Sequence, residues 1–67
     1  MNIKKLGKKI KLARTEMDLN QTQLANKINA KQKSISRYET GASSPSIATL
    51  MKIAKELKKP AGYFLDE

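Results

Sequence analysis

Five of the polar side chains between residues 31 and 37 fall on the outward face of an expected helix, where they can hydrogen-bond the edges of nucleic-acid bases. They are Lys31, Gln32, Lys33, Ser36 and Arg37. Arginine and lysine donate to the two acceptors of guanine, whereas glutamine matches the donor and acceptor of adenine. No acidic residue lies between Asp18 and Glu39, so a polyanion can approach without repulsion. The segment is either a set of base-reading residues or a solvated polar surface, and we favour the former.

The chain as a whole is strongly basic. Its 67 residues include 14 lysines and arginines against 6 aspartates and glutamates, a formal net charge of +8. Such a field attracts polyanions, and duplex DNA carries one charge per roughly 1.7 Å of axis. The charge alone fits a lysine-rich surface that serves solubility equally well. A solvated face with long-range attraction, rather than specific contacts, is expected for Lys4, Lys5, Lys8, Lys9 and Lys11.

The sequence contains no cysteine and no histidine. This removes disulfides, thiolate and imidazole metal ligands, and the usual nucleophile and general base. We therefore expect no enzyme, no metal and no cofactor. There is no apolar run of the roughly 20 residues that a membrane span needs, and the first residues carry lysines but no apolar run of the length expected in a signal peptide. We expect a cytoplasmic protein without membrane contact, associated with the nucleoid when it is bound to DNA.

The polar residues need a scaffold, and apolar residues three or four apart indicate helices throughout. A chain this short, with no repeat and no linker, predicts a single compact all-α domain over residues 1–67. The first helix should end near Asp18. Its inner face comprises Ile3, Leu6, Ile10, Ala13 and Met17.

Residues 20–41 predict two helices joined by a tight turn. Asn20 is a favoured N-cap, and Gln23 can complete a capping box. Asn29 tolerates the left-handed conformation that a sharp helix exit demands. The second of these helices should run over about 31–40 and stop at Gly41. Small Ala25 permits steep packing, and the other inward-facing residues are Leu24, Ile28, Ile35 and Tyr38.

Two further helices bring the predicted number to five. Ser46 should cap the fourth helix. Its apolar positions are Ile47, Leu50, Met51, Ala54 and Leu57. Pro60 can open a last short turn. Much of the bulky apolar surface that closes the core should come from Tyr63, Phe64 and Leu65.

Several motifs fall in register at once with one known family. They are "LGKKIKLARTEMDLNQTQLANKI" at residues 6–28, "SISRYETGASSPSIATLMKIAKEL" at 34–57 and the closing "GYFLDE" at 62–67. In these stretches, which cover almost all of the chain, it resembles the Cro/repressor-type (XRE) helix-turn-helix family. The resemblance implies the lambda-repressor-like fold and sequence-specific binding of double-stranded DNA by a transcriptional regulator, most often a repressor.

The resemblance also assigns residues. It places the helix at about 31–40 in the major groove, where Lys31, Gln32, Lys33, Ser36 and Arg37 read bases or line the groove. Positions that contact phosphate in the family correspond to Asn20, Gln21, Thr40, Ala42 and Ser43. A partly buried ion pair that ties the first helix to the third corresponds to Arg14 and Glu39.

The chain departs from the family pattern at three positions. Asn29 replaces the usual turn glycine, and Lys58 replaces a glycine after the fourth helix. Lys31 stands where serine or threonine often caps the recognition helix, which weakens that cap. Lys31 is therefore open to a phosphate-binding role instead of base reading.

A single helix reads too few bases to be selective in a genome, so a two-fold homodimer on half-sites about 34 Å apart is expected. Phe64 and Leu65 are weak candidates for its interface. An alternative is a module of the same fold that binds a protein, such as an antitoxin, but the polar basic face does not favour it. A membrane-surface helix and stacking on RNA are disfavoured by the scarcity of exposed aromatic residues.

Overall fold

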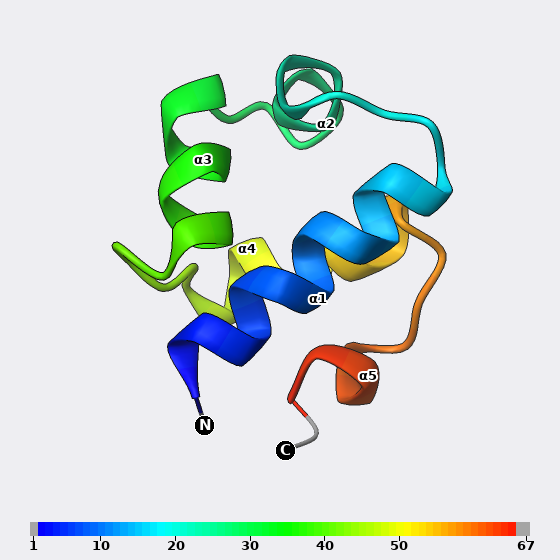
Figure 1. The fold of residues 1–67 in the computed structure, drawn as a ribbon. Helices are drawn as coiled ribbons and strands as arrows, with labels where there is room; N and C mark the ends of the chain where they lie inside the picture. Colours follow the sequence, from blue (N-terminus) through cyan, green and yellow to red (C-terminus); the bar gives the residue numbers. More distant parts are fainter. Residues whose placement is uncertain (1, 66–67) are drawn as a thin grey trace.

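The computed structural model describes residues 2–65, and in this range all of the regular structure is helical (Figure 1). The helices are α1 (Ile3–Glu16), α2 (Gln21–Lys27), α3 (Gln32–Thr40), α4 (Ile47–Glu56) and α5 (Ala61–Leu65). The predicted all-α fold of five helices is thus confirmed over the described part of the chain. None of these helices is both long and apolar enough to cross a membrane.

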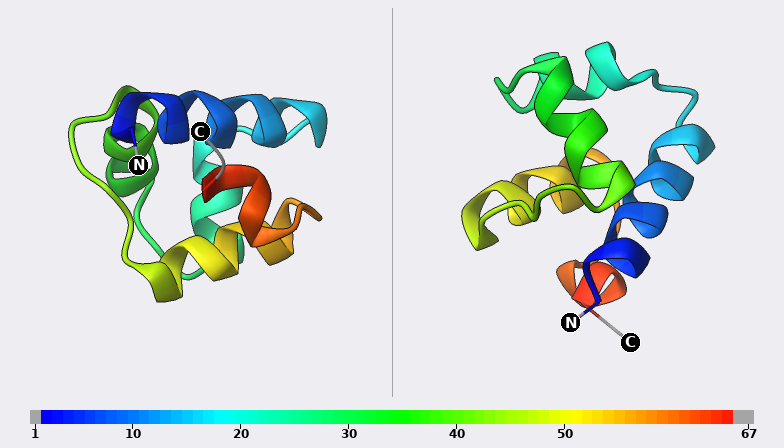
Figure 2. Two further views of the ribbon diagram at one scale, coloured as in Figure 1. Left: turned by 90° about the horizontal axis from the view of Figure 1, so that it is seen from below. Right: turned by 60° about the vertical axis from the view of Figure 1, so that its left-hand side comes forward.

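The helices pack around one core. α3 packs against both α1 and α2, and α5 packs against α1 and α4. Seen from below, α1 and α4 lie on opposite sides with α5 between them, and α3 stands at one end (Figure 2). The arrangement leaves one long side of α3 without a neighbouring helix.

The helix ends follow the local chemistry of the chain. Asn20 accepts from the Gln23 N–H at 2.7 Å and donates its own N–H to Gln23 Oε1 at 2.8 Å, which confirms the capping box. Asn29 (φ 57°) and Gly41 (φ 81°) adopt the left-handed conformation that the two helix exits require. Lys58 (φ 57°) adopts the same conformation at the position where the family pattern led us to expect glycine. α1 ends at Glu16, slightly before the predicted end, and Asp18 turns the chain with φ 56°.

The buried face of α4 differs from the prediction. Ile47 and Met51, expected to face inward, are 62% and 59% exposed, whereas the unassigned Ile53 is fully buried. The apolar residues of α4 form two stripes along neighbouring faces of the helix. Only the stripe that packs against α2 and α5 is buried. That stripe comprises Leu50, Ile53, Ala54 and Leu57.

Helix α5 also departs in part from the prediction. Phe64 is 1% exposed and closes the core as expected, but Leu65 is 41% exposed and Tyr63 is only half-buried. Phe64 is therefore unavailable as a dimer contact, contrary to the expectation.

Two lysines contact Tyr63 of α5. The ammonium of Lys9 donates to the Tyr63 carbonyl oxygen at 3.0 Å, and the ammonium groups of Lys9 and Lys59 lie 5.6 and 5.0 Å from the centre of the Tyr63 ring. Lys9 thus helps to fasten α5 to α1 rather than forming only a solvated face.

Replacing Gly7 with alanine is expected to lower the free energy of unfolding by about 1–3 kcal/mol. A Cβ there would lie 2.7 Å from the Glu39 carbonyl oxygen and 2.9 Å from its carbonyl carbon. Backbone atoms cannot swing aside, so α1 would have to move off α3, and this cost exceeds the helix-propensity gain of about 1 kcal/mol from replacing glycine. Urea denaturation checks the value. The matched control is Gly62→Ala, whose Cβ meets nothing within 4 Å, and equal stabilities of the two variants would contradict the close packing of α1 on α3.

Candidate nucleic-acid interface

The turn between α2 and α3 sets the angle at which α3 leaves the body of the protein. Ile28 caps the end of α2, Asn29 reverses the chain, and the Ala30 N–H donates back to the Ala25 carbonyl oxygen at 2.8 Å. Ala25 and Ile35 are 1% and 0% exposed. Because the Ala25 methyl is small, α2 and α3 approach closely, and Ile35 fixes the inner side of α3. The opposite side of α3 is therefore directed outward.

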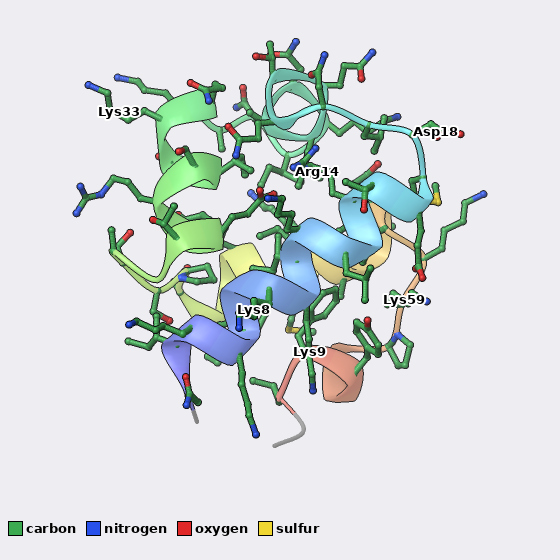
Figure 3. The ribbon with its side chains drawn as sticks, viewed as in Figure 1. Lys8, Lys9, Arg14, Asp18, Lys33 and Lys59 are labelled. Carbon is green, nitrogen blue, oxygen red and sulfur yellow. The ribbon has the colours of Figure 1, made fainter. Side chains whose placement is uncertain are left out.

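The outward side of α3 carries the predicted base-reading residues. Lys31, Gln32, Lys33 and Arg37 are exposed, and Ser36 is half-buried. Lys33 extends from α3 away from the rest of the molecule (Figure 3). The acidic residue of α3, Glu39, is turned inward and is 8% exposed. The outward side of α3 is therefore a cationic, hydrogen-bonding surface without an exposed carboxylate.

Lys31 occupies the N-cap of α3 and supplies no capping hydrogen bond from its side chain. Its backbone is extended (φ −97°, ψ 147°), and its carbonyl oxygen accepts from the Ser34 and Ile35 N–H groups. Lysine has no side-chain acceptor that could satisfy the first-turn amides. The Lys31 ammonium is therefore not committed to holding the helix end.

Arg14 and Glu39 form the ion pair that the resemblance implied. Arg14 Nε lies 2.6 Å from Glu39 Oε2, and its Nη2 lies 3.0 Å from Oε1. The same guanidinium donates through Nη1 to the Leu19 carbonyl oxygen at 2.7 Å. Arg14 points from α1 into the angle between α2 and α3 (Figure 3). This bidentate pair fixes α3 and the loop before α2 to α1.

Gln21 and Gln32 are joined to this ion pair, a connection that the sequence did not reveal. Gln21 Nε2 donates to Glu39 Oε1 at 3.0 Å, and Gln32 Nε2 donates to Gln21 Oε1 at 2.6 Å. A chain of hydrogen bonds thus runs from the buried guanidinium to the exposed side of α3. Residues 11 and 18 positions apart meet only when α2 and α3 are packed, so no local spacing could have indicated it.

The remaining residues expected at phosphate lie on either side of this network. The Asn20 side-chain oxygen is occupied as the α2 cap, which leaves its amide nitrogen for a ligand. Thr40 and Ser43 follow at the other end of α3. The main-chain N–H groups of Ala42 and Ser43 both donate to the Arg37 carbonyl oxygen, at 2.9 and 3.3 Å. A phosphate contact through the Ala42 amide would therefore have to replace an existing bond.

Comparison with known proteins agrees with this geometry. Residues 10–64 match the family model for helix-turn-helix domains. A curated relative from Rhodospirillum rubrum, described as an uncharacterized transcriptional regulator in the ATPase CF(0) region, is 34% identical over 62 residues. The match covers 92% of this chain and 57% of the relative, so the chain spans little more than half of that protein's length.

Solved structures share the fold. The restriction-modification controller protein C.AhdI from Aeromonas hydrophila superposes with a TM-score of 0.88 at 22% identity, covering 92% of this chain and 94% of that one. The clp gene regulator ClgR from C. glutamicum gives 0.88 at 18% identity, covering 97% and 84%. Bacillus thuringiensis PlcR, solved with the peptide PapR7 and DNA, gives 0.87 at 40% identity, covering 94% of this chain but 22% of PlcR.

The family assignment rests on both sequence and geometry. The matched residues 10–64 include both helices of the bihelical corner, the turn at Asn29 and the helices that support them. The Cro/repressor-type resemblance of the sequence is confirmed. The chain belongs to the helix-turn-helix family.

Proposed function

We propose that this chain binds double-stranded DNA in a sequence-specific manner and regulates transcription, with α3 in the major groove. The observation that carries the proposal is the outward side of α3, where Lys31, Gln32, Lys33 and Arg37 are exposed while Glu39 is turned into the core. A helix that presents cations and an amide to solvent fits a groove whose walls are anionic and whose floor offers hydrogen-bond partners. This is a binding role rather than a catalytic one.

Two similarities support the proposal. PlcR, which is 40% identical over the aligned region, was solved in complex with DNA, and the Rhodospirillum rubrum relative is described as a transcriptional regulator. Because both proteins are longer than this chain, the activity of the whole regulator, including repression as against activation, is part of the proposal. Repression needs only occupancy of a promoter site, so we propose a repressor. A DNA ligand also implies action in the cytoplasm, at the nucleoid.

In this proposal, one set of interface residues contacts the phosphates and another set contacts the bases. Contacts to phosphate from Asn20, Gln21 and the stretch 40–43 set the register of the protein on the duplex. Base edges are read by Gln32, Lys33, Ser36 and Arg37, while Lys31 at the entrance of α3 serves phosphate or base. Gln21 takes part in both functions, since its oxygen already holds the Gln32 amide.

Selection from a random pool of duplex DNA at a fixed salt concentration, combined with sedimentation of the free and bound protein, tests the function. We expect a selected motif with two-fold symmetry, half-sites about 34 Å apart and two chains per site. Enrichment of no sequence would contradict specific binding, and an asymmetric motif bound by one chain would contradict the dimer. Leu65, which is 41% exposed, remains available for a dimer contact, unlike Phe64.

Arg37→Ala should weaken binding to the selected motif by about 1–3 kcal/mol and relax the preference at one base position. The guanidinium is exposed on the outward side of α3 and can donate twice to one guanine. Titration against all single-base variants of the motif measures both effects. Lys8→Ala is the matched control, because it removes the same charge from an exposed position on α1, away from α3 (Figure 3). Equal losses on every sequence would argue against base reading by Arg37.

A further inference from the structure

The side-chain hydrogen bonds at the base of α3 form a chain with a fixed direction. Glu39 Oε1 accepts from Gln21 Nε2 at 3.0 Å, and Gln21 Oε1 accepts from Gln32 Nε2 at 2.6 Å. Glu39 is 8% exposed and is held by Arg14 through both carboxylate oxygens. Gln21 is half-buried and Gln32 is exposed. The chain thus leads from a buried charge to a side chain at the surface.

The direction follows from the chemistry of its innermost member. An ionised carboxylate can only accept hydrogen bonds, so the Gln21 group that faces Glu39 must be the NH₂. The Gln21 oxygen then faces Gln32 and can only accept, which requires the Gln32 NH₂ on that side. One N–H of Gln32 is used in this bond. Its second N–H and its oxygen remain, side by side, for a ligand.

We propose that Glu39, although buried, is a specificity-determining positioning residue that makes Gln32 an adenine reader. Adenine presents one acceptor, N7, beside one donor, the N6 amino group, in the major groove. Gln32 in the observed orientation presents one donor beside one acceptor. It therefore matches the adenine pair without any reorientation of its side-chain amide. This inference rests on the proposed DNA-binding function and adds to it a residue that does not contact DNA.

Glu39→Gln should reverse the direction of the chain. The shorter Arg14 contact, 2.6 Å from Nε to Oε2, keeps an oxygen at that position. The new NH₂ then takes the Oε1 position, where it faces Gln21 and gives up the longer contact of 3.0 Å with Arg14 Nη2. Gln21 must then turn its oxygen inward and its NH₂ toward Gln32, and Gln32 must turn its oxygen toward Gln21. The outward group of Gln32 becomes NH₂ alone, a double donor that suits the N7 and O6 acceptors of guanine.

The variant Gln32→Ala first identifies the base position that Gln32 reads, as the position at which this variant loses its base preference. The affinities of wild type and Glu39→Gln are then compared on the selected motif, with each of the four base pairs placed in turn at that position. We expect the ratio of affinities for adenine over guanine at this position to fall by about tenfold or more in Glu39→Gln, with preferences elsewhere retained. An unchanged ratio overturns the inference. Side-chain amide NMR of the free protein gives a second readout, since the Gln32 NH₂ resonances should shift in Glu39→Gln although the two residues do not touch.

Two further variants separate positioning from stability. Gln21→Met keeps the Arg14–Glu39 pair but breaks the chain, so the adenine preference should decline without a new guanine preference; its survival overturns the inference even if Glu39→Gln fails to fold. Ile53→Val lowers stability in the core and should leave the ratio unchanged; a matching decline in this variant would assign the effect to stability and overturn the inference. If the wild type selects no sequence, the proposed DNA-binding function itself fails. If it selects a motif whose adenine preference persists in both Glu39→Gln and Gln21→Met, only the inference fails.

Discussion

Arg14→Ala is expected to lower the free energy of unfolding by about 3–5 kcal/mol, because it leaves the Glu39 carboxylate buried and unpaired. The side chains of Arg14 and Glu39 are 9% and 2% exposed, so water cannot replace the lost partner. The Leu19 carbonyl oxygen would also lose its donor at 2.7 Å. A chain of 67 residues has a total stability of roughly 3–10 kcal/mol, so the variant should be largely unfolded near room temperature.

Urea denaturation followed by circular dichroism measures the Arg14→Ala effect. The informative comparison is with the double variant Arg14→Met/Glu39→Leu, which removes the buried carboxylate together with its counter-ion. Replacing a whole buried ion pair with apolar residues of similar volume is often neutral or stabilising, so the double variant should recover much of the loss. If the single variant loses less than about 1 kcal/mol, the pair behaves like an exposed one and does not hold α1 to α3.

Phe64→Ala is expected to cost about 3–5 kcal/mol. The Phe64 ring is 1% exposed and is among the largest side chains that the described core buries completely. It anchors the five-residue helix α5 between α1 and α4, and a helix this short has no stability of its own. Removal of the ring leaves a cavity, and the contacts around Tyr63 are too exposed to compensate for it.

Thermal and urea unfolding of Phe64→Ala give the measured loss, and hydrogen exchange of the α5 amides locates it. Leu65→Ala is the control on the same helix, since a side chain that is 41% exposed should change stability by no more than about 0.5 kcal/mol. Similar losses in the two variants would mean that α5 is held by its whole apolar surface rather than by the Phe64 ring.

Local features of the chain were predictable because they depend on residues close together in sequence. The capping box of Asn20 and Gln23, the exit at Asn29 and the stop at Gly41 each follow from the conformational preference of one or two side chains. The outward placement of Lys31, Gln32, Lys33 and Arg37 followed as well, because Ile35 is the apolar anchor of α3 and faces the core. The family resemblance added the pairing of Arg14 with Glu39, which local chemistry could not supply.

Other features depended on which surfaces meet. The sequence of α4 offers two apolar stripes, and only packing against α2 and α5 selected the one with Ile53 and left Ile47 and Met51 exposed. Likewise, Lys9 is one of several lysines along α1, and its contact with Tyr63 exists only because α5 folds back on that face.

The amino-acid sequence by itself determined the helices, their ends and the cationic character of α3, since these follow from side-chain type and from spacing within a few residues. Only the tertiary structure decided which apolar stripe is buried and how Glu39, Gln21 and Gln32 connect. The physical reason is distance along the chain: a hydrogen bond between residues 11 or 18 positions apart depends on how two helices cross. That crossing is set by the packing of the entire core.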